Sequence, residues 1–366
     1  MKKLLALALS LLMLGGLAAP SMAEGVTKDT IKIGFVHISD PSDMGYTYNH
    51  DLGTIKMAET LGLSEDQIIN KYNIPETAEC ASAIQELIDA GCNMIFATSF
   101  GHGDYMLAAA QENPGIEFFH ATGYYAAGSG LTNLHNYFAN IYEARYLAGI
   151  AAGLKTETNK LGYVGAFPFA EVISGFTGFY LGAKSVNPDV EMTVMYTNSW
   201  NDPTVEAQIA KALIDQGCDV ISQHSDSTAP ATTAEANSVF HVGYNADMIP
   251  AAPNASLISA RIDWSKYLTY AVETYLAGEA IPADWSKGFA DAVVYLSPLN
   301  DAIAAEGTAD AIAAAEAALL DGSLQVFAGP LVDNTGAVVV AEGDVFVEPA
   351  SAPSFAAILE GITSVQ

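Results

Sequence analysis

Basic residues are scarce in this sequence of 366 residues, where 14 lysines and arginines stand against 42 aspartates and glutamates. The formal net charge of −28 repels phosphate backbones and anionic lipids, which argues against nucleic acids and membrane surfaces as partners. Apolar residues make up 51% of the chain, which is too many for a disordered protein. We therefore expect a folded, highly soluble protein.

Cysteine is also rare, and the three cysteines lack the spacing of a metal site. Because their number is odd, at least one must be free. Cys92 and Cys218 each stand where a helical pattern passes into a strand, which favours small, buried, apolar side chains. We expect neither a metal site nor a structural disulfide.

Catalytic motifs are missing as well. The sequence contains no Gly-x-Ser-x-Gly, no phosphate-binding loop, no Gly-x-Gly-x-x-Gly after the first strand and no His-Glu-x-x-His. His50 and Asp51 form an adjacent histidine–acid pair, which is more typical of solvated surface than of a metal or base site. The sequence therefore predicts no catalytic residue and no cofactor, and a binding protein rather than an enzyme.

The sequence has a single long apolar run, at residues 4–17. Lys2 and Lys3 precede this run, and small residues follow it at 18–23. This order predicts a secretory signal peptide, residues 1–23, cut after Ala23. Fourteen apolar positions are too few to span a bilayer. No cysteine stands near the cut, so we expect a protein without a lipid anchor, soluble in the periplasm or another extracytoplasmic compartment.

The rest of the chain is longer than one hydrophobic core usually supports, which predicts two domains. Apolar, β-branched segments alternate with helical patterns, which is typical of βαβ units and a parallel sheet. A further strand at 290–296 precedes an alanine-rich helix at 308–320. The other expected strands are 30–39, 93–98, 116–122 and 161–166, and the other expected helices include 79–90, 105–111 and 142–154.

An internal repeat supports two similar lobes. LIDAGCNMI at 87–95 recurs as LIDQGCDVI at 213–221, 126 positions later. In each copy a helix ends at a glycine and a buried strand follows, although helix–strand junctions can also resemble one another by chance. Ligands of open parallel sheets bind beyond the carboxyl ends of the strands, so two such lobes create a cleft. Its expected loops are 40–49, 98–103, 121–125, 167–171, 198–202, 223–227 and 244–247.

These loops are rich in aromatic, acidic and amide side chains. Aromatic faces stack on a planar ring, and carboxylates or amides bind its N–H and N edge, although any single aromatic could instead pack in the core. Tyr48, Tyr125, Phe169 and Tyr244 also fall in these loops. The candidate ligand-binding residues are Asp43, Tyr46, Asn49, Phe100, Tyr124, Phe167, Glu171, Trp200, His224, Asp226, Asn245 and Asp247.

A set of motifs through most of the chain resembles the basic membrane protein family, the solute-binding proteins of ABC importers that include purine nucleoside and nucleobase binders. The motifs are GF (34–35), DMGYTYNHDLG (43–53), ATSFG (97–101), HATGY (120–124), EARYLAG (143–149), GAKSVNP (182–188), NSWNDP (198–203), QHSDS (223–227), GYNADM (243–248) and FAGP (327–330). The resemblance implies a periplasmic-binding-protein type I fold, α/β, with two Rossmann-like lobes joined by three hinge crossovers. The lobes would be 24–157 plus about 262–297, and 158–261 plus about 298–366.

The resemblance also implies a ligand. Tyr46 and a residue of 223–227 would sandwich a purine ring, which Asp43 and Asn49 would hydrogen-bond. Nucleoside binders of the family carry an acid near Asn245 and a lysine near Ile262 for the ribose, so this chain favours a bare nucleobase such as adenine.

The partners implied are the permease subunits of an ABC importer, and we expect a monomer. Two alternatives stay open. One is a ligand-sensing protein for a signalling receptor. The other, less favoured, is an exported nucleoside hydrolase using Asp40 or Asp43 with Asp226.

Overall fold

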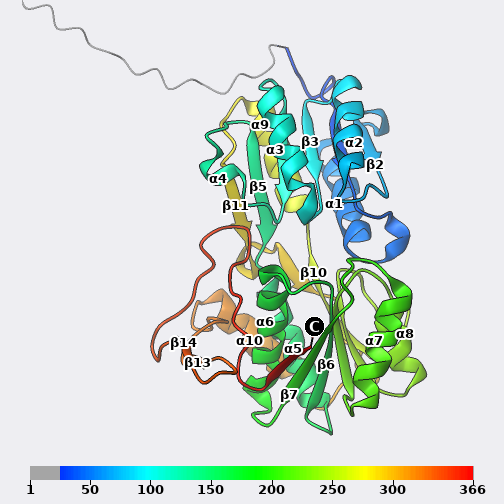
Figure 1. Cartoon of the computed structure of the whole chain (residues 1–366), viewed down its shortest axis with the longest axis vertical. Helices are drawn as coiled ribbons and strands as arrows, with labels where there is room; N and C mark the ends of the chain where they lie inside the picture. The colour runs from blue at the N-terminus through cyan, green and yellow to red at the C-terminus, as the bar shows by residue number, and fades with distance from the viewer. Residues whose placement is uncertain (1–24, 366) are drawn as a thin grey trace, which may run out of the picture.

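Two mostly parallel β-sheets, each covered by helices on both faces, form two lobes stacked along the long axis of the molecule (Figure 1). The computed structural model describes residues 25–365. The predicted signal peptide, residues 1–23, lies outside these residues. The two-lobed α/β fold expected from the alternating pattern is confirmed.

The first sheet has the strand order β11-β5-β4-β3-β1-β2, and all of its pairs are parallel. Ile33 and Phe35 face one apolar cluster and Val36 faces another, so β1 is buried on both sides, as its continuous apolar sequence predicts. Its strands are β1 (Ile33–Val36), β2 (Ile68–Lys71), β3 (Met94–Ala97), β4 (Glu117–Ala121), β5 (Leu134–Ala139) and β11 (Asp284–Lys287).

Helices from distant parts of the chain cover this sheet. Helices α1 and α9 pack on the face of Phe35, and α2 and α3 pack on the face of Val36. The helical segments are η1 (Pro41–Asp43), α1 (Tyr46–Leu61), η2 (Glu65–Gln67), α2 (Ala78–Asp89), η3 (Phe100–His102), α3 (Gly103–Glu112), α4 (Ala126–Ser129) and α9 (Ser265–Ala277).

The second sheet has the order β12-β10-β9-β8-β6-β7-β15, and only β12 pairs antiparallel within its described strands. Helices α7 and α8 cover one face, and α5 and α6 cover the other. The strands are β6 (Lys160–Gly165), β7 (Glu191–Tyr196), β8 (Val220–His224), β9 (Phe240–Tyr244), β10 (Ser256–Ile262), β12 (Val294–Leu296) and β15 (Ile362–Val365).

The remaining elements complete the second lobe. A small antiparallel hairpin, β13 with β14, lies near the C-terminus. Helix α10 occupies the residues expected for the alanine-rich helix, whereas the strand expected at 290–296 forms only at 294–296. These elements are α5 (Ile141–Lys155), α6 (Ala170–Val186), α7 (Pro203–Asp215), α8 (Ala229–Ala236), η4 (Phe289–Asp291), α10 (Thr308–Leu320), β13 (Leu331–Val332) and β14 (Val338–Val340).

The internal repeat corresponds to equivalent parts of the two lobes. In each copy a helix (α2 or α7) ends before a glycine with positive φ, +82° at Gly91 and +93° at Gly217, and a strand follows. Strand β3 lies between β1 and β4, as β8 lies between β6 and β9. Cys92 and Cys218, like Cys80, are buried and free, which confirms their expected role as small apolar side chains.

The first crossover between the lobes lies earlier than expected. We expected the helix at 142–154 to close a first lobe ending at 157, but α5 packs on α6, β9 and β10 of the second lobe. The packing is so close that a Cβ at Gly149 would collide with the carbonyl oxygen of Phe179. The chain therefore crosses between β5 and α5, between β10 and α9, and between β11 and β12. The third crossover also lies earlier than the expected boundary at about 297, because β12 pairs with β10 in the second sheet.

Candidate ligand-binding site

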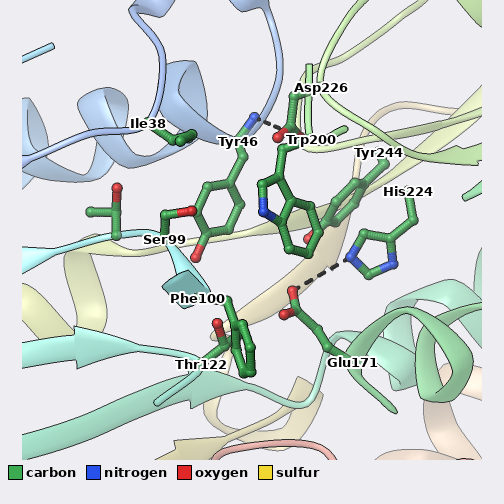
Figure 2. Close-up of a pocket in the computed structure, with 11 residues that line it drawn as sticks. Ile38, Tyr46, Ser99, Phe100, Thr122, Glu171, Trp200, His224, Asp226 and Tyr244 are labelled. Atoms are coloured by element: carbon green, nitrogen blue, oxygen red, sulfur yellow. Dashed lines mark hydrogen bonds and ion pairs between the residues drawn. The ribbon is translucent and has the colours of Figure 1, made fainter. Parts of the chain in front are cut away.

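A small cavity lies between the lobes, beyond the carboxyl ends of strands from both sheets (Figure 2). The cavity is nearly closed, with only about 20 Å³ of room for the centre of a water molecule. Both lobes contribute, so the cavity exists only when they are together. Its lining residues are Ile38, Tyr46, Thr98, Ser99, Phe100 and Thr122 from the first lobe, and Glu171, Trp200, His224, Asp226 and Tyr244 from the second.

Aromatic rings form much of the wall. Figure 2 shows Tyr46, Phe100, Trp200 and Tyr244 around one space. Tyr46 begins α1 and is 9% exposed, and its ring lies edge-on to Trp264, centroid to centroid 5.8 Å. The indole N–H of Trp200 has no hydrogen-bond partner among the described residues. Flat apolar walls with an unused donor suit a planar ligand that carries an acceptor.

Glu171, near the start of α6, and His224, at the end of β8, form the polar side of the cavity. Nε2 of His224 lies 3.5 Å from Oε1 of Glu171, within the range of an ion pair (Figure 2). Burial raises the pKa of Glu171 to about 8, and burial together with the charge of Arg145 lowers the pKa of His224. Both groups are therefore uncharged at neutral pH, and the contact is not an ion pair.

The ionisable side chains that line the cavity, apart from His224, are acidic. None of the described lining residues is a lysine or arginine. The nearby guanidinium of Arg145 lies over the ring of Tyr244, 3.8 Å from its centroid, and donates from Nη1 to Tyr163 and to the carbonyl of Gln223. Burial raises the pKa of Asp226, and its neighbours Asp43 and Glu206 raise it further. The cavity is thus built for a neutral ligand or one with N–H donors, not for an anion.

Half of the sequence candidates line the cavity. They come from η3 and α1 in the first lobe and from the start of α6, two loops and the end of β8 in the second. The strand-end rule therefore located the cavity. The candidates that line it are Tyr46, Phe100, Glu171, Trp200, His224 and Asp226.

Four polar candidates are bonded to the protein and do not line the cavity. Asp43 accepts backbone N–H groups at the start of α1. Asn49 donates from Nδ2 to the carbonyl of Ile262 at 2.8 Å, and Asp247 accepts the N–H of Ile249 at 3.0 Å. Asn245 donates to Oδ1 of Asp226 at 3.4 Å, with its own φ at +65°.

Two aromatic candidates also lie outside the lining. Tyr124 is 54% exposed, and its ring stacks on Tyr125 at 4.6 Å. Phe167 lies edge-on to Trp200 at 5.0 Å and supports that ring from behind. The expectation that His50 is solvated surface is wrong, because His50 is fully buried and stacks on Trp264 at 4.0 Å.

Five lining residues were not among the candidates. Ile38, Thr98 and Ser99 follow β1 and β3, and Thr122 follows β4, so the strand-end rule could have found them. Tyr244 lies in one of the predicted cleft loops. Small hydroxyl and aliphatic side chains give no chemical signal of their own, so the sequence does not mark the other four as ligand contacts.

Metal binding and membrane insertion gain no support from residues 25–365. Within that range no three histidine, cysteine or acidic side chains come together in a way that could hold an ion. None of the helices there combines the length and hydrophobicity of a bilayer-spanning segment.

Known proteins resemble this chain in sequence and in fold. It is 34% identical to a purine-binding protein of Brucella abortus over 91% of each chain. It is 35% identical to a putative ABC transporter glucose-binding protein of Haloferax volcanii, over 82% of this chain and 75% of that one. An ABC transporter solute-binding protein of Conexibacter woesei shares the fold, with a TM-score of 0.66 at 17% identity, covering 81% of this chain and 98% of that one.

The family itself follows from the match over most of the chain. Residues 30–323 match the family of PnrA-like ABC transporter substrate-binding proteins. That span includes all of the cavity lining and both sheets except β15. Proteins of this family bind a solute and present it to a transporter, and they are not enzymes. This chain is a member of the PnrA-like family of ABC transporter substrate-binding proteins.

Proposed function

We propose that this protein captures a purine in the cavity between its lobes and delivers it to the permease of an ABC importer. The observation that carries the proposal is a small cavity whose walls are aromatic rings from both lobes and whose polar groups are carboxyl and imidazole groups. Aromatic faces stack on a heterocycle, and the polar groups bind its edge. The name of the Brucella relative, a purine-binding protein, supports this choice.

The charge state of Glu171 fits a purine edge. A protonated carboxyl group donates through its hydroxyl and accepts through its carbonyl oxygen. A purine edge offers the complementary pair, a ring nitrogen acceptor beside an N–H donor. Oε2 of Glu171 has no partner among the described residues and is free to pair with such an edge. Trp200 would donate its indole N–H to a further ring nitrogen or carbonyl of the ligand.

A nucleobase is favoured over a nucleoside. The closed cavity leaves only about 20 Å³ for the centre of a water molecule, so a bare ring would need less opening of the lobes than a ring with a sugar. Asn245 and Ile262, at positions where the family resemblance would require ribose ligands, do not line the cavity. Ile262 is 1% exposed and its carbonyl accepts from Asn49, so it lies in the hinge.

Sugar is the competing solute, because one relative is named as a putative glucose-binding protein. A ligand panel decides between the two. Ligand-stripped protein is titrated calorimetrically with adenine, guanine, hypoxanthine, adenosine, inosine and glucose, and thermal shifts are recorded in parallel. We expect the tightest binding for a free base. Binding of glucose alone, or of no purine, would refute the proposed ligand, and turnover of a nucleoside would refute a purely binding role.

The cellular setting follows from the same proposal. Residues 1–23 direct export, and the cleaved chain acts as a monomer in the periplasm. N-terminal sequencing of the exported protein should begin at Glu24, and sedimentation should give a monomer mass. A sensing role shares the same cavity, so growth on a purine with and without the gene for this protein separates transport from signalling.

A further inference from the structure

One backbone N–H group at the N-terminus of α1 forms its hydrogen bond with the opposite lobe. The first N–H groups of an α-helix lack partners within the helix. Asp43, in the same lobe, accepts those of Gly45 at 2.8 Å, Thr47 at 3.1 Å and Tyr48 at 3.0 Å. The N–H of Tyr46 donates instead to Oδ1 of Asp226 at 3.2 Å, across the cleft. The capping of α1 is therefore complete only when the lobes are closed.

Gly45 allows this contact by having no side chain. It is the N-cap of α1 and contributes no side-chain hydrogen bond. A Cβ at Gly45 would lie 2.6 Å from Cα and 2.7 Å from Cβ of Asp226. The close approach of Asp226 therefore leaves no room for a side chain at this position.

Asp226 is held firmly by its own lobe. Its N–H donates to the carbonyl of Trp200 at 2.9 Å, and Oδ1 also accepts from Asn245 at 3.4 Å. Asn245 itself adopts the left-handed backbone conformation, with φ at +65°. Asp226 is 4% exposed, so little water competes for its oxygen. Because these contacts lie within one lobe, they hold the carboxyl group in position before the lobes close.

We propose that Asp226 acts as an interlobe cap on α1 that stabilises the closed form, and that Gly45 is the positioning residue that lets it do so. The proposal goes beyond the identity of the ligand, because the contact joins protein atoms of the two lobes. A carboxyl oxygen at a helix N-terminus accepts the N–H groups that the helix leaves without partners. Apparent ligand affinity scales with the fraction of molecules able to reach the binding state, so this contact contributes to affinity by stabilising the closed form.

The test is Gly45→Ala against Gly115→Ala. Gly115 has no atom within 4 Å of its added Cβ and no positive φ, so it is a matched control. Nitroxide labels on Ser82→Cys in α2 and Gln208→Cys in α7, both exposed, report the distance between lobes by electron double resonance. The native cysteines are buried and should not take label. Gly45→Ser, with a larger side chain, should shift the distances further in the same direction.

In the wild type and in Gly115→Ala, we expect the distance between the two labels to be that of the closed structure. In Gly45→Ala, we expect this distance to be longer. Ligand should dissociate about tenfold faster or more in that variant, with little change in association rate. Its ligand-free melting temperature should match the control, because the contact lies between lobes.

A Gly45→Ala distance distribution equal to that of the control would overturn the proposal, as would a wild type that never reaches the closed distance. The distance measurement needs no ligand, so it still decides if every purine fails to bind. Failure of the proposed ligand and failure of the interlobe cap are therefore told apart.

Discussion

Glu171→Gln should remove a pH dependence that the cavity imposes on the folded protein. Burial raises the pKa of Glu171 from 4.5 to about 8. Between these values the folded protein binds more protons at this site than the unfolded chain does, so its stability falls as pH rises from about 5 to 8. Each unit of pKa shift is worth about 1.4 kcal/mol, so by pH 7 the loss at this site approaches roughly 3 kcal/mol as an upper bound. Glutamine keeps the shape and does not ionise.

The measurement is urea denaturation of the wild type, Glu171→Gln and the control Glu112→Gln, which alters an exposed side chain, at pH values from 5 to 8. Other buried carboxyl groups, such as Asp226 and Glu206, titrate in all three proteins. The informative quantity is therefore the stability of Glu171→Gln minus that of the wild type. We expect this difference to grow with pH, while the control difference stays flat. A Glu171→Gln difference that is constant from pH 5 to 8 would refute the reasoning.

Three further predictions address the site, the core and the thiols. Tyr46→Ala should weaken ligand binding by about 1–3 kcal/mol in calorimetry, as loss of a stacked ring does, while Tyr46→Phe should keep most of the affinity. An unchanged affinity for alanine would mean that Tyr46 only packs on His50 and Trp264. Gly182→Ala should cost about 2–3 kcal/mol of stability, because its Cβ would meet the carbonyl oxygen of Tyr146, and a melting temperature equal to that of Gly115→Ala would contradict this. The three cysteines should react with a thiol reagent only after denaturation, because all are buried and burial raises their pKa values to about 11–12; rapid labelling of the native protein would contradict this.

The fold was predictable from the internal repeat, because each copy specifies a local structure. A glycine that ends a helix, followed by a strand buried on both faces, specifies one βαβ junction, and two copies specify two lobes. The lobe to which α5 belongs was not predictable in this way. Its glycines at 149 and 153 face the backbone of α6, and such a contact between helices separated by a strand gives no local periodic signal.

The position of the cavity was predictable from the sequence, but only some of the residues that line it were. Strand ends located the cavity, and large or charged side chains there were good candidates. Asp43 and Asn49 have the same chemistry as true ligand contacts, yet here they pair with backbone groups of α1 and of the hinge. A short polar side chain at a helix start satisfies its own backbone as readily as a ligand, and the sequence alone does not distinguish the two.

The neutral pair of Glu171 and His224 bears on the choice between a purine and a sugar. An ionised carboxylate in a cavity without lysine or arginine would favour a cation or a ligand that only donates. Protonated Glu171 both donates and accepts, as a sugar hydroxyl and a purine edge both require. The ring faces then favour the purine, because Tyr46, Phe100, Trp200 and Tyr244 can stack on a planar heterocycle, whereas the other polar side chains of the lining would serve either ligand. A planar heterocycle uses both the ring faces and the polar groups, and this is why the purine is the stronger hypothesis.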